Sequence, residues 1–171
     1  MKTMKITPSL IVSQARAFGV IDIENLAMGS SMIEPWICKS LANYLDQNFG
    51  HQPVMWVGAT GSNAHRRHPY LNFDFPKARL LCRPGIDGAD KCLEEVLMLE
   101  PASRRSSKVI IASGDGLLAP CAAQMKAEGC RIVVVGREGC IARGLLKIAD
   151  EIFYFNPIAT EFKPLNVKGG L

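Results

Sequence analysis

Short, continuous runs of apolar residues recur along the chain. Most of these runs are separated by segments in which apolar residues follow helical spacing. Continuous apolar runs of this length are typical of strands whose two faces are both covered. The runs are Ala17–Ile23, Pro53–Thr60, Ala78–Cys82, Val109–Ser113, Arg131–Val135 and Ile152–Phe155. Because strands that alternate with helices are joined by crossover connections, they lie parallel in one sheet. The sequence therefore predicts a three-layer α/β/α domain with a mostly parallel central sheet.

Helical periodicity marks several segments between these runs. The predicted helices are Glu34–Phe49, Gly88–Leu99, Leu117–Glu128 and Ile141–Ile148. A chain of 171 residues is long enough for one packed domain and does not require a second. We therefore divide it into an N-terminal extension (1–16), a single domain (17–156) and a C-terminal tail (157–171).

Composition limits the environment of the protein more than its function. The net charge of +4 is compatible with a polyanionic partner but does not identify one. The six cysteines form no C-x-x-C pair and no zinc-site spacing, so we expect free thiols in a reducing, cytoplasmic environment. We find no secretory signal and no apolar stretch near the roughly 20 residues of a membrane span, and we expect no membrane association. A homo-oligomer is compatible with the sequence.

Polar residues follow several of the predicted strands, and most of them are aspartates. In open α/β sheets, ligands bind outside the carboxyl ends of the parallel strands. The residues near those ends are Asp22, Asn25, Asp87, Asp90, Ser113 and Asp115. Steps of three and four also place Asp87, Asp90 and Glu94 along one side of a helix that begins near Gly88.

Each of these residues taken alone has an ordinary structural explanation. A single Asp22 or Asp115 at a strand end is more often a turn residue or a helix N-cap than a catalytic group. Asp87 fits a helix cap, Asn25 fits an Asx-turn, and Glu94 fits a solvated helix position. Independent capping does not explain why acidic groups from three segments meet at one edge of a sheet. Their combination favours a site.

Clustered carboxylates repel one another, and a divalent cation relieves that repulsion. Hard oxygen ligands with room for retained waters suit Mg²⁺ or Mn²⁺ better than zinc. Such an ion lowers the pKa of a bound water and neutralises charge that develops on a phosphate. The pattern therefore predicts metal-dependent phosphate chemistry.

Three segments resemble the NYN-domain family of PIN-like ribonucleases. They are Val20–Leu26 (VIDIENL), Ile86–Leu93 (IDGADKCL) and Ile110–Gly116 (IIASGDG). The segments Gly129–Val135 and Leu145–Phe155 resemble the end of the family's domain, so the likeness covers most of residues 20–155. The resemblance implies a PIN-like parallel sheet and an RNA-hydrolysing site.

By the same resemblance, individual positions acquire expected roles. Asp22, Asp90 and Asp115 would be the catalytic residues and the ligands of Mg²⁺ or Mn²⁺. Asp87 would be a further candidate, and Asn25 and Ser113 would support the metal or its waters. The expected substrate is RNA.

The chain departs from the family pattern after Asp115. Many members carry another aspartate shortly after the S-G-D segment, whereas this chain continues with Leu117 and Leu118. The change is compatible with one metal instead of two, with metal binding completed by the substrate, or with lost catalysis. Asp150 also resembles a recurrent family position, although a structural role at a helix end explains it equally well.

A basic loop, Gly61–Pro69, follows the second predicted strand and is expected at the same edge. Arg66 and Arg67 would grip phosphates, and His65 and His68 would contact RNA or assist proton transfer. A solvated loop is the alternative for each residue. Because no cysteine or third histidine stands at matching spacing, His65 and His68 do not predict a zinc site.

Two other functional classes compete with the nuclease. The first is a catalytically inactive RNA-binding or adaptor module, which the Leu117 departure favours. The second is a phosphatase or a receiver-like phosphoacceptor, but the chain lacks the D-x-D pairing and the lysine-bearing loop of such sites.

Overall fold

The computed structural model describes residues 16–28, 33–61, 68 and 70–157, and these form a single parallel sheet covered by helices. The strand order is β3-β2-β1-β4-β5-β6, and all five neighbouring pairs are parallel. The strands are β1 (Ala17–Asp22), β2 (Val54–Gly61), β3 (Ala78–Arg83), β4 (Lys108–Ala112), β5 (Arg131–Gly136) and β6 (Glu151–Tyr154). The predicted α/β class and parallel sheet are therefore confirmed.

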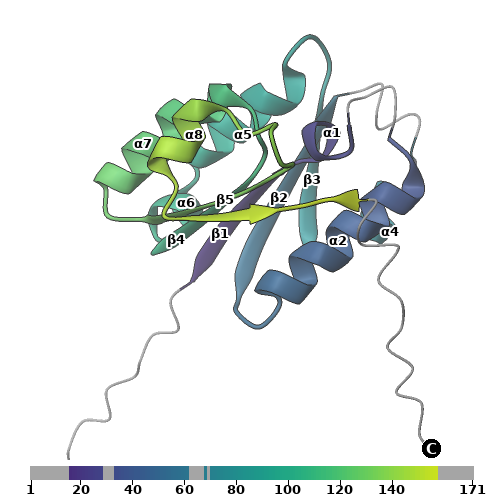
Figure 1. Cartoon of the computed structure of the whole chain (residues 1–171), viewed down its shortest axis with the longest axis horizontal. Helices are drawn as coiled ribbons and strands as arrows, with labels where there is room; N and C mark the ends of the chain where they lie inside the picture. Colours follow the sequence, from purple (N-terminus) through teal and green to yellow (C-terminus); the bar gives the residue numbers. More distant parts are fainter. Residues whose placement is uncertain (1–15, 29–32, 62–67, 69, 158–171) are drawn as a thin grey trace, which may run out of the picture.

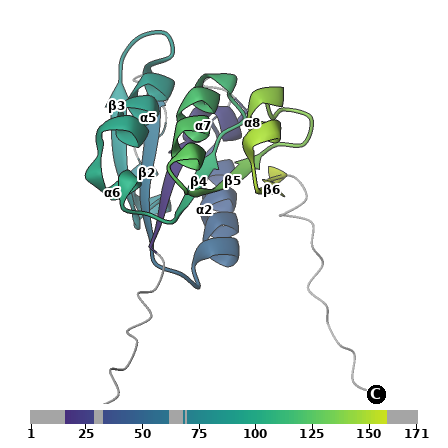
Figure 2. The same cartoon turned by 90° about the vertical axis from the view of Figure 1, so that its left-hand side faces the viewer.

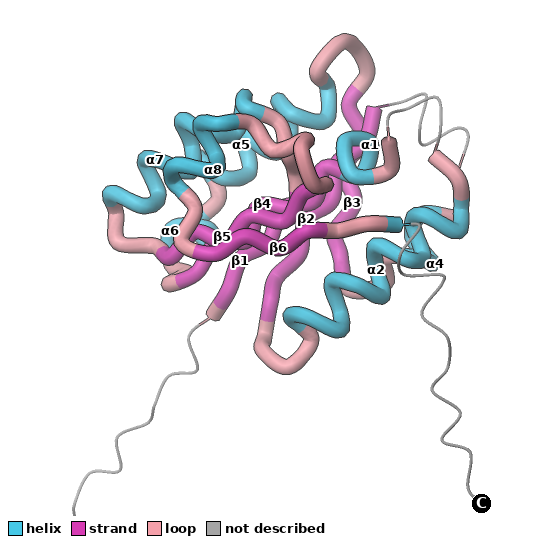
Figure 3. The backbone as a smooth tube through the Cα atoms, viewed as in Figure 1, coloured by secondary structure: helices cyan, strands magenta, loops and turns pink. Residues whose placement is uncertain are grey.

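Helices lie on both sides of the sheet, as Figures 1 and 2 show. The α-helices are α1 (Ile23–Leu26), α2 (Pro35–Phe49), α4 (Leu71–Asp74), α5 (Gly88–Leu99), α6 (Pro101–Arg104), α7 (Ala119–Ala127) and α8 (Arg143–Ile148), with a 3₁₀ turn η1 (Gly116–Leu118). Helices α2 and α4 lie on one side, and α5, α7 and α8 lie on the other. In Figure 3 the strands form the middle layer between these two groups.

Alternating strand residues supply two separate cores. One core joins α2 to the sheet through residues such as Leu41, Ile21 and Ile110. The other joins α5, α7 and α8 to the sheet through residues such as Leu93 and Val20. Because successive side chains of a strand point to opposite faces, both cores draw on the same strands. All six residues of β1 are buried, as expected for a strand covered on both faces.

Several boundaries differ from the prediction for identifiable reasons. Ile23 was assigned to the first strand but begins α1, because Asp22 caps that helix and ends the strand. Between α5 and β4 lies the unpredicted helix α6, where the buried Ser103 hydroxyl donates to the Leu97 and Glu100 carbonyls. The four-residue helices were not predicted, because a segment of four residues is too short to show a helical period of apolar residues.

Within the described residues, no helix combines the length and the apolar character that a membrane span requires.

Gly19 provides a test of the packing in the centre of the sheet. A Cβ at Gly19 would lie 2.2 Å from the Trp56 ring, which belongs to the neighbouring strand β2. Gly19→Ala should therefore lower the free energy of unfolding by about 1–3 kcal/mol, the usual cost of overpacking. Urea denaturation measures this loss. In a Trp56→Leu background the cost should shrink, and an equal loss in both backgrounds would contradict the proposed clash.

Candidate functional site

The ends of β1 and β4 bring two of the predicted site residues together. These strands are parallel neighbours, with Ile21 opposite Ala112. The following residues, Asp22 and Ser113, are both buried, and Ser113 Oγ lies 3.3 Å from Asp22 Oδ2. Asp22 continues the alternation of Phe18 and Val20, so its side chain leaves the sheet on the side of α5.

Asp22 also caps helix α1. Its Oδ1 accepts a hydrogen bond from the backbone N–H of Asn25 at 3.0 Å. The capping explanation is therefore correct for one carboxylate oxygen, while the other oxygen faces Ser113. The cap orients the carboxyl group and does not exclude it from a site.

A hydrogen-bonded turn after β4 positions Asp115. The Asp115 N–H donates to Ser113 Oγ at 3.1 Å, and the Gly114 N–H donates to Asn25 Oδ1 at 2.9 Å. The Asp115 side chain in turn accepts from the Leu117 N–H at 2.9 Å and caps η1. Asn25 and Ser113 thus tie the Ser-Gly-Asp segment to the end of β1. Their expected role around a metal or its waters stays a prediction.

Gly114 is required by close packing within this turn. A Cβ at this position would lie 2.3 Å from the backbone carbonyl oxygen of Cys140. The Gly114 carbonyl also accepts from the Ala142 N–H at 2.9 Å. Only glycine lets the segment before α8 approach the turn so closely.

Asp90 reaches the same place from the first turn of α5. Its carboxyl group lies close enough to that of Asp22 for each of the two groups to shift the pKa of the other. Its Oδ1 atom is buried and has no hydrogen-bond partner among the residues that the structure describes. A buried carboxylate oxygen without a partner is costly, and it is a natural position for a bound cation or water.

Burial and neighbouring negative charges raise the pKa of both of these carboxyl groups. Burial, as the main cause, and the charge of Asp90, as a smaller one, together raise the pKa of Asp22 to about 7. Burial also raises the pKa of Asp90, followed by the negative charges of Asp115 and Asp87. In the absence of a metal, the Asp22–Asp90 pair therefore holds a proton close to neutral pH.

No positive side chain neutralises this group in the described part of the chain. The ion pairs found there use other carboxylates, namely Asp46, Asp74, Glu95, Glu100, Asp150 and Glu151. The oxygens of Asp22, Asp90 and Asp115 do not, however, lie within 4.8 Å of one another as a set of three among the described residues. One cation would therefore reach all three only with the help of bound waters or small side-chain movements.

Asp87 and Glu94 lie further from the centre of the group. Asp87 is exposed and precedes α5 in a left-handed conformation with φ of 55°, and its side chain does not cap the helix. Its charge nevertheless reaches Asp90. Glu94 is exposed, in agreement with a solvated helix position.

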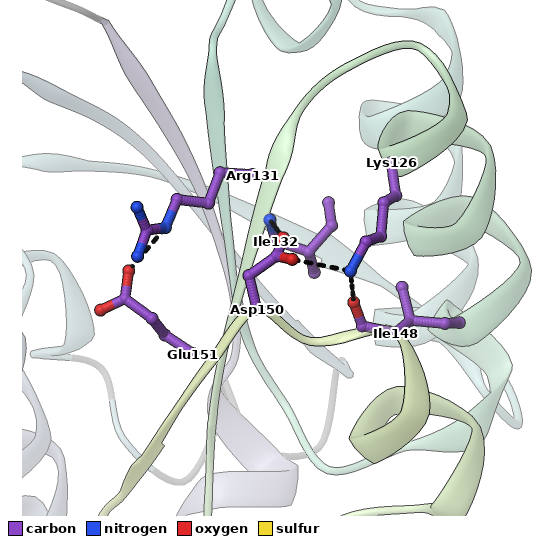
Figure 4. A network of polar contacts seen from close by, with 6 residues as sticks. All are labelled: Lys126, Arg131, Ile132, Ile148, Asp150 and Glu151. Atoms are coloured by element: carbon purple, nitrogen blue, oxygen red, sulfur yellow. Dashed lines mark hydrogen bonds and ion pairs between the residues drawn. The ribbon is translucent and has the colours of Figure 1, made fainter.

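Asp150 has a structural role at the opposite edge of the sheet, as Figure 4 shows. Its two oxygens accept from Lys126 Nζ at 2.7 Å and from the Ile132 N–H at 2.8 Å. These hydrogen bonds lower its pKa. Because Ile132 lies at the beginning of β5 and the acidic group lies beyond the carboxyl ends, Asp150 is not part of that group.

Of the basic loop Gly61–Pro69, Gly61 and His68 belong to the described residues. His65, Arg66 and Arg67 lie outside the described residues, so their predicted contact with RNA is untested. His68 is 2% exposed, and its Nε2 lies 2.6 Å from Asp74 Oδ2. This buried position does not suit the predicted RNA contact, because the side chain is turned into the protein.

A second set of potential ligands was missed by the sequence analysis. Cys38, His68 and Asp74 each offer a ligand atom, and these atoms all lie within 4.8 Å of one another. The exclusion of a zinc site rested on sequence spacing, but helices α2 and α4 pack together and bring Cys38 and Asp74 close to His68. No local motif signals such a contact.

Comparisons with known proteins support the fold only. The sequence matches no protein-family model and no curated protein sequence. It is similar in structure to a protein of unknown function from Vibrio parahaemolyticus, with a TM-score of 0.60 and 14% sequence identity. The similarity covers 84% of this chain and 94% of that chain. The class that follows is a parallel α/β domain with an acidic group at the carboxyl edge of its sheet.

The raised pKa of Asp22 leads to a stability prediction for the metal-free protein. Because this pKa of about 7 exceeds the ordinary value of 3.8, the folded protein holds a proton that the unfolded chain has lost. The free energy of unfolding should therefore fall as the pH rises from about 4 to about 7. Asp22→Asn removes this penalty and should stabilise the protein at pH 8 by roughly 1–3 kcal/mol, with little gain at pH 4.

Denaturation in the presence of EDTA at both pH values measures the effect. Asp46→Asn is the matched control, because it removes an exposed carboxylate that pairs with the exposed Lys77. If Asp22→Asn were no more stable than the wild type at pH 8, the buried and repelled carboxyl pair would be refuted.

Proposed function

We propose that this chain is a metal-dependent endoribonuclease of the NYN branch of PIN-like nucleases, which hydrolyses RNA phosphodiester bonds. The observation that carries the proposal is the proximity of the buried Asp22 to Asp90, whose Oδ1 atom is buried without a hydrogen-bond partner among the described residues. Asp115 lies close enough to influence Asp90 electrostatically. Three chain segments supply these carboxylates, and they are the three segments that resemble the family.

The donor set fits Mg²⁺ or Mn²⁺. The group offers carboxylate oxygens, including the unpartnered Asp90 Oδ1, together with the Ser113 hydroxyl. The spread of the three carboxylates also fits an ion that retains several waters, as Mg²⁺ does. When bound there, the ion would supply an activated water and would neutralise charge on the phosphate.

The protein's own residues would hold and orient this group. Asn25 donates from its backbone to Asp22 and accepts from the Gly114 N–H, so it connects two of the acidic segments. Ser113 connects Asp22 to the backbone of Asp115. Because both bridges are short and partly buried, the carboxylates are positioned before any ligand binds.

Electrostatics support a polyanionic substrate once the carboxylates are neutralised. The chain has a net charge of +4 in spite of its acidic site. Arg66 and Arg67 follow β2, whose carboxyl end lies at the same edge as the site. We therefore propose that these arginines contact RNA phosphates.

Substitution of the carboxylates tests the nuclease proposal. Asp22→Asn, Asp90→Asn and Asp115→Asn should each lower the rate of RNA cleavage at least about 100-fold, because each removes a charge that holds the cation. Cleavage of a fluorescently labelled single-stranded RNA in the presence of Mn²⁺ measures the rate. Asp46→Asn again serves as the control and should keep wild-type activity. Full activity in both the Asp22 and the Asp115 variants would overturn the assignment.

A catalytically inactive RNA-binding or adaptor module is the second candidate. Two observations favour it: Leu117 is 54% exposed beside Asp115 where many family members carry an aspartate nearby, and the three carboxylates do not converge within 4.8 Å. Such a module should bind RNA in EDTA and yield no product even with Mn²⁺. Fluorescence anisotropy combined with the cleavage assay separates the two functions.

A further inference from the structure

Cys38, His68 and Asp74 converge on the side of the sheet that faces away from the acidic site. Cys38 lies in the first turn of α2, His68 lies between β2 and α4, and Asp74 is the last residue of α4. Cys38 belongs to the core that joins α2 to the sheet. Two chain regions therefore supply the three side chains: helix α2 supplies Cys38, and a stretch of seven residues supplies His68 and Asp74.

The donor atoms are close to the spacing of a metal site. The Cys38 Sγ, a His68 ring nitrogen and an Asp74 carboxylate oxygen all lie within 4.8 Å of one another. Ligand atoms around tetrahedral zinc stand roughly 3.3–3.6 Å apart, given the usual metal–ligand distances. His68 Nε2 and Asp74 Oδ2, now 2.6 Å apart, would separate by less than about 1 Å to admit an ion.

The three side chains differ in their exposure to solvent. Cys38 is 0% exposed and His68 is 2% exposed, while the Asp74 side chain retains 18% exposure. Asp74 also lines a cavity of about 250 Å³ that includes Trp56 and Phe75. Asp74 is therefore the most exposed of the three residues.

A catalytic Cys-His-Asp triad is a poorer explanation of this arrangement. A nucleophilic cysteine needs a lowered pKa and access to substrate. Burial, and then the charge of Asp74, raise the pKa of the Cys38 thiol to about 12, and the sulfur has no access to solvent. A simple His–Asp hydrogen bond accounts for two of the residues but leaves the position of Cys38 unexplained.

We propose that Cys38, His68 and Asp74 bind one zinc ion, or another thiophilic divalent cation, through one sulfur, one nitrogen and one oxygen donor, with water in the fourth position. Such mixed ligands favour zinc over the harder ions that suit the acidic site. The ion has a structural role, because it ties the segment after β2 to helices α2 and α4. Binding releases the thiol proton, so the affinity rises with pH. This site does not depend on the proposed nuclease function.

Zinc and cobalt binding to the full-length protein test the proposal. The starting variant is Cys82→Ser/Cys140→Ser, which removes the two exposed thiols and should still bind one equivalent of zinc. Adding Co²⁺ to it should produce the near-ultraviolet band of a cobalt–thiolate bond. Cys38→Ser should abolish this band and, like His68→Gln, weaken zinc binding at least about tenfold.

Controls separate this site from the acidic one and from misfolding. Asp22→Asn should leave zinc stoichiometry and the cobalt band unchanged, whereas zinc held by the acidic site would be lost. Cys121→Ser replaces a different buried thiol and should also keep the band. Circular dichroism and the zinc-induced rise in Tm establish that each variant folds. No bound zinc in the starting variant, or an unchanged band in Cys38→Ser, would overturn the proposal.

Discussion

The parallel pairing of β1 with β4 determines where the rest of the candidate site lies. Ile21 stands opposite Ala112, so Asp22 and Ser113 emerge side by side where the two strands end. Both continue the alternation that points toward α5, and the first turn of that helix carries Asp90. A register shift of one residue would turn Asp22 to the α2 side and separate the pair. The acidic group is therefore a consequence of the same packing that forms the core.

That packing also creates the chemistry of the site. Strand β1 is fully buried, and its last residue is held where water cannot solvate a charge. Asp90 lies close to Asp22 from the first turn of α5, and no lysine or arginine of the described residues pairs with either carboxylate. A proton or a cation must therefore compensate the repulsion between the two carboxylates. Two apolar cores stabilise the domain and hold this unfavourable pair in place. Sites that are costly in the absence of ligand are common where binding is the function.

Sequence patterns predicted the sheet and the acidic group because both depend on local signals. Apolar runs marked the strands, and the known geometry of parallel sheets placed Asp22, Asp90 and Asp115 at one edge. Distances within the group were not predictable, since they depend on how α5 tilts over the sheet. His68 was misjudged because its neighbours in sequence are polar, whereas its burial results from Cys38 and Asp74. The spacing of residues in a sequence reveals metal ligands only when they share a local motif. Cys38 lies on a different helix from Asp74, so sequence spacing did not reveal this set.

The two candidate sites differ in donor chemistry, and that difference has a physical consequence. Zinc binds most donor sets more tightly than Mg²⁺ does, so affinity alone would let zinc occupy the acidic site as well. The Cys38 sulfur and the His68 nitrogen provide a softer alternative on the α2 side of the sheet, while the carboxylates face α5. The sheet lies between them, and no residue belongs to both groups. A zinc ion held on the α2 side would therefore neither share a ligand with the acidic site nor neutralise the repulsion between Asp22 and Asp90, so the acidic site would still need a cation of its own.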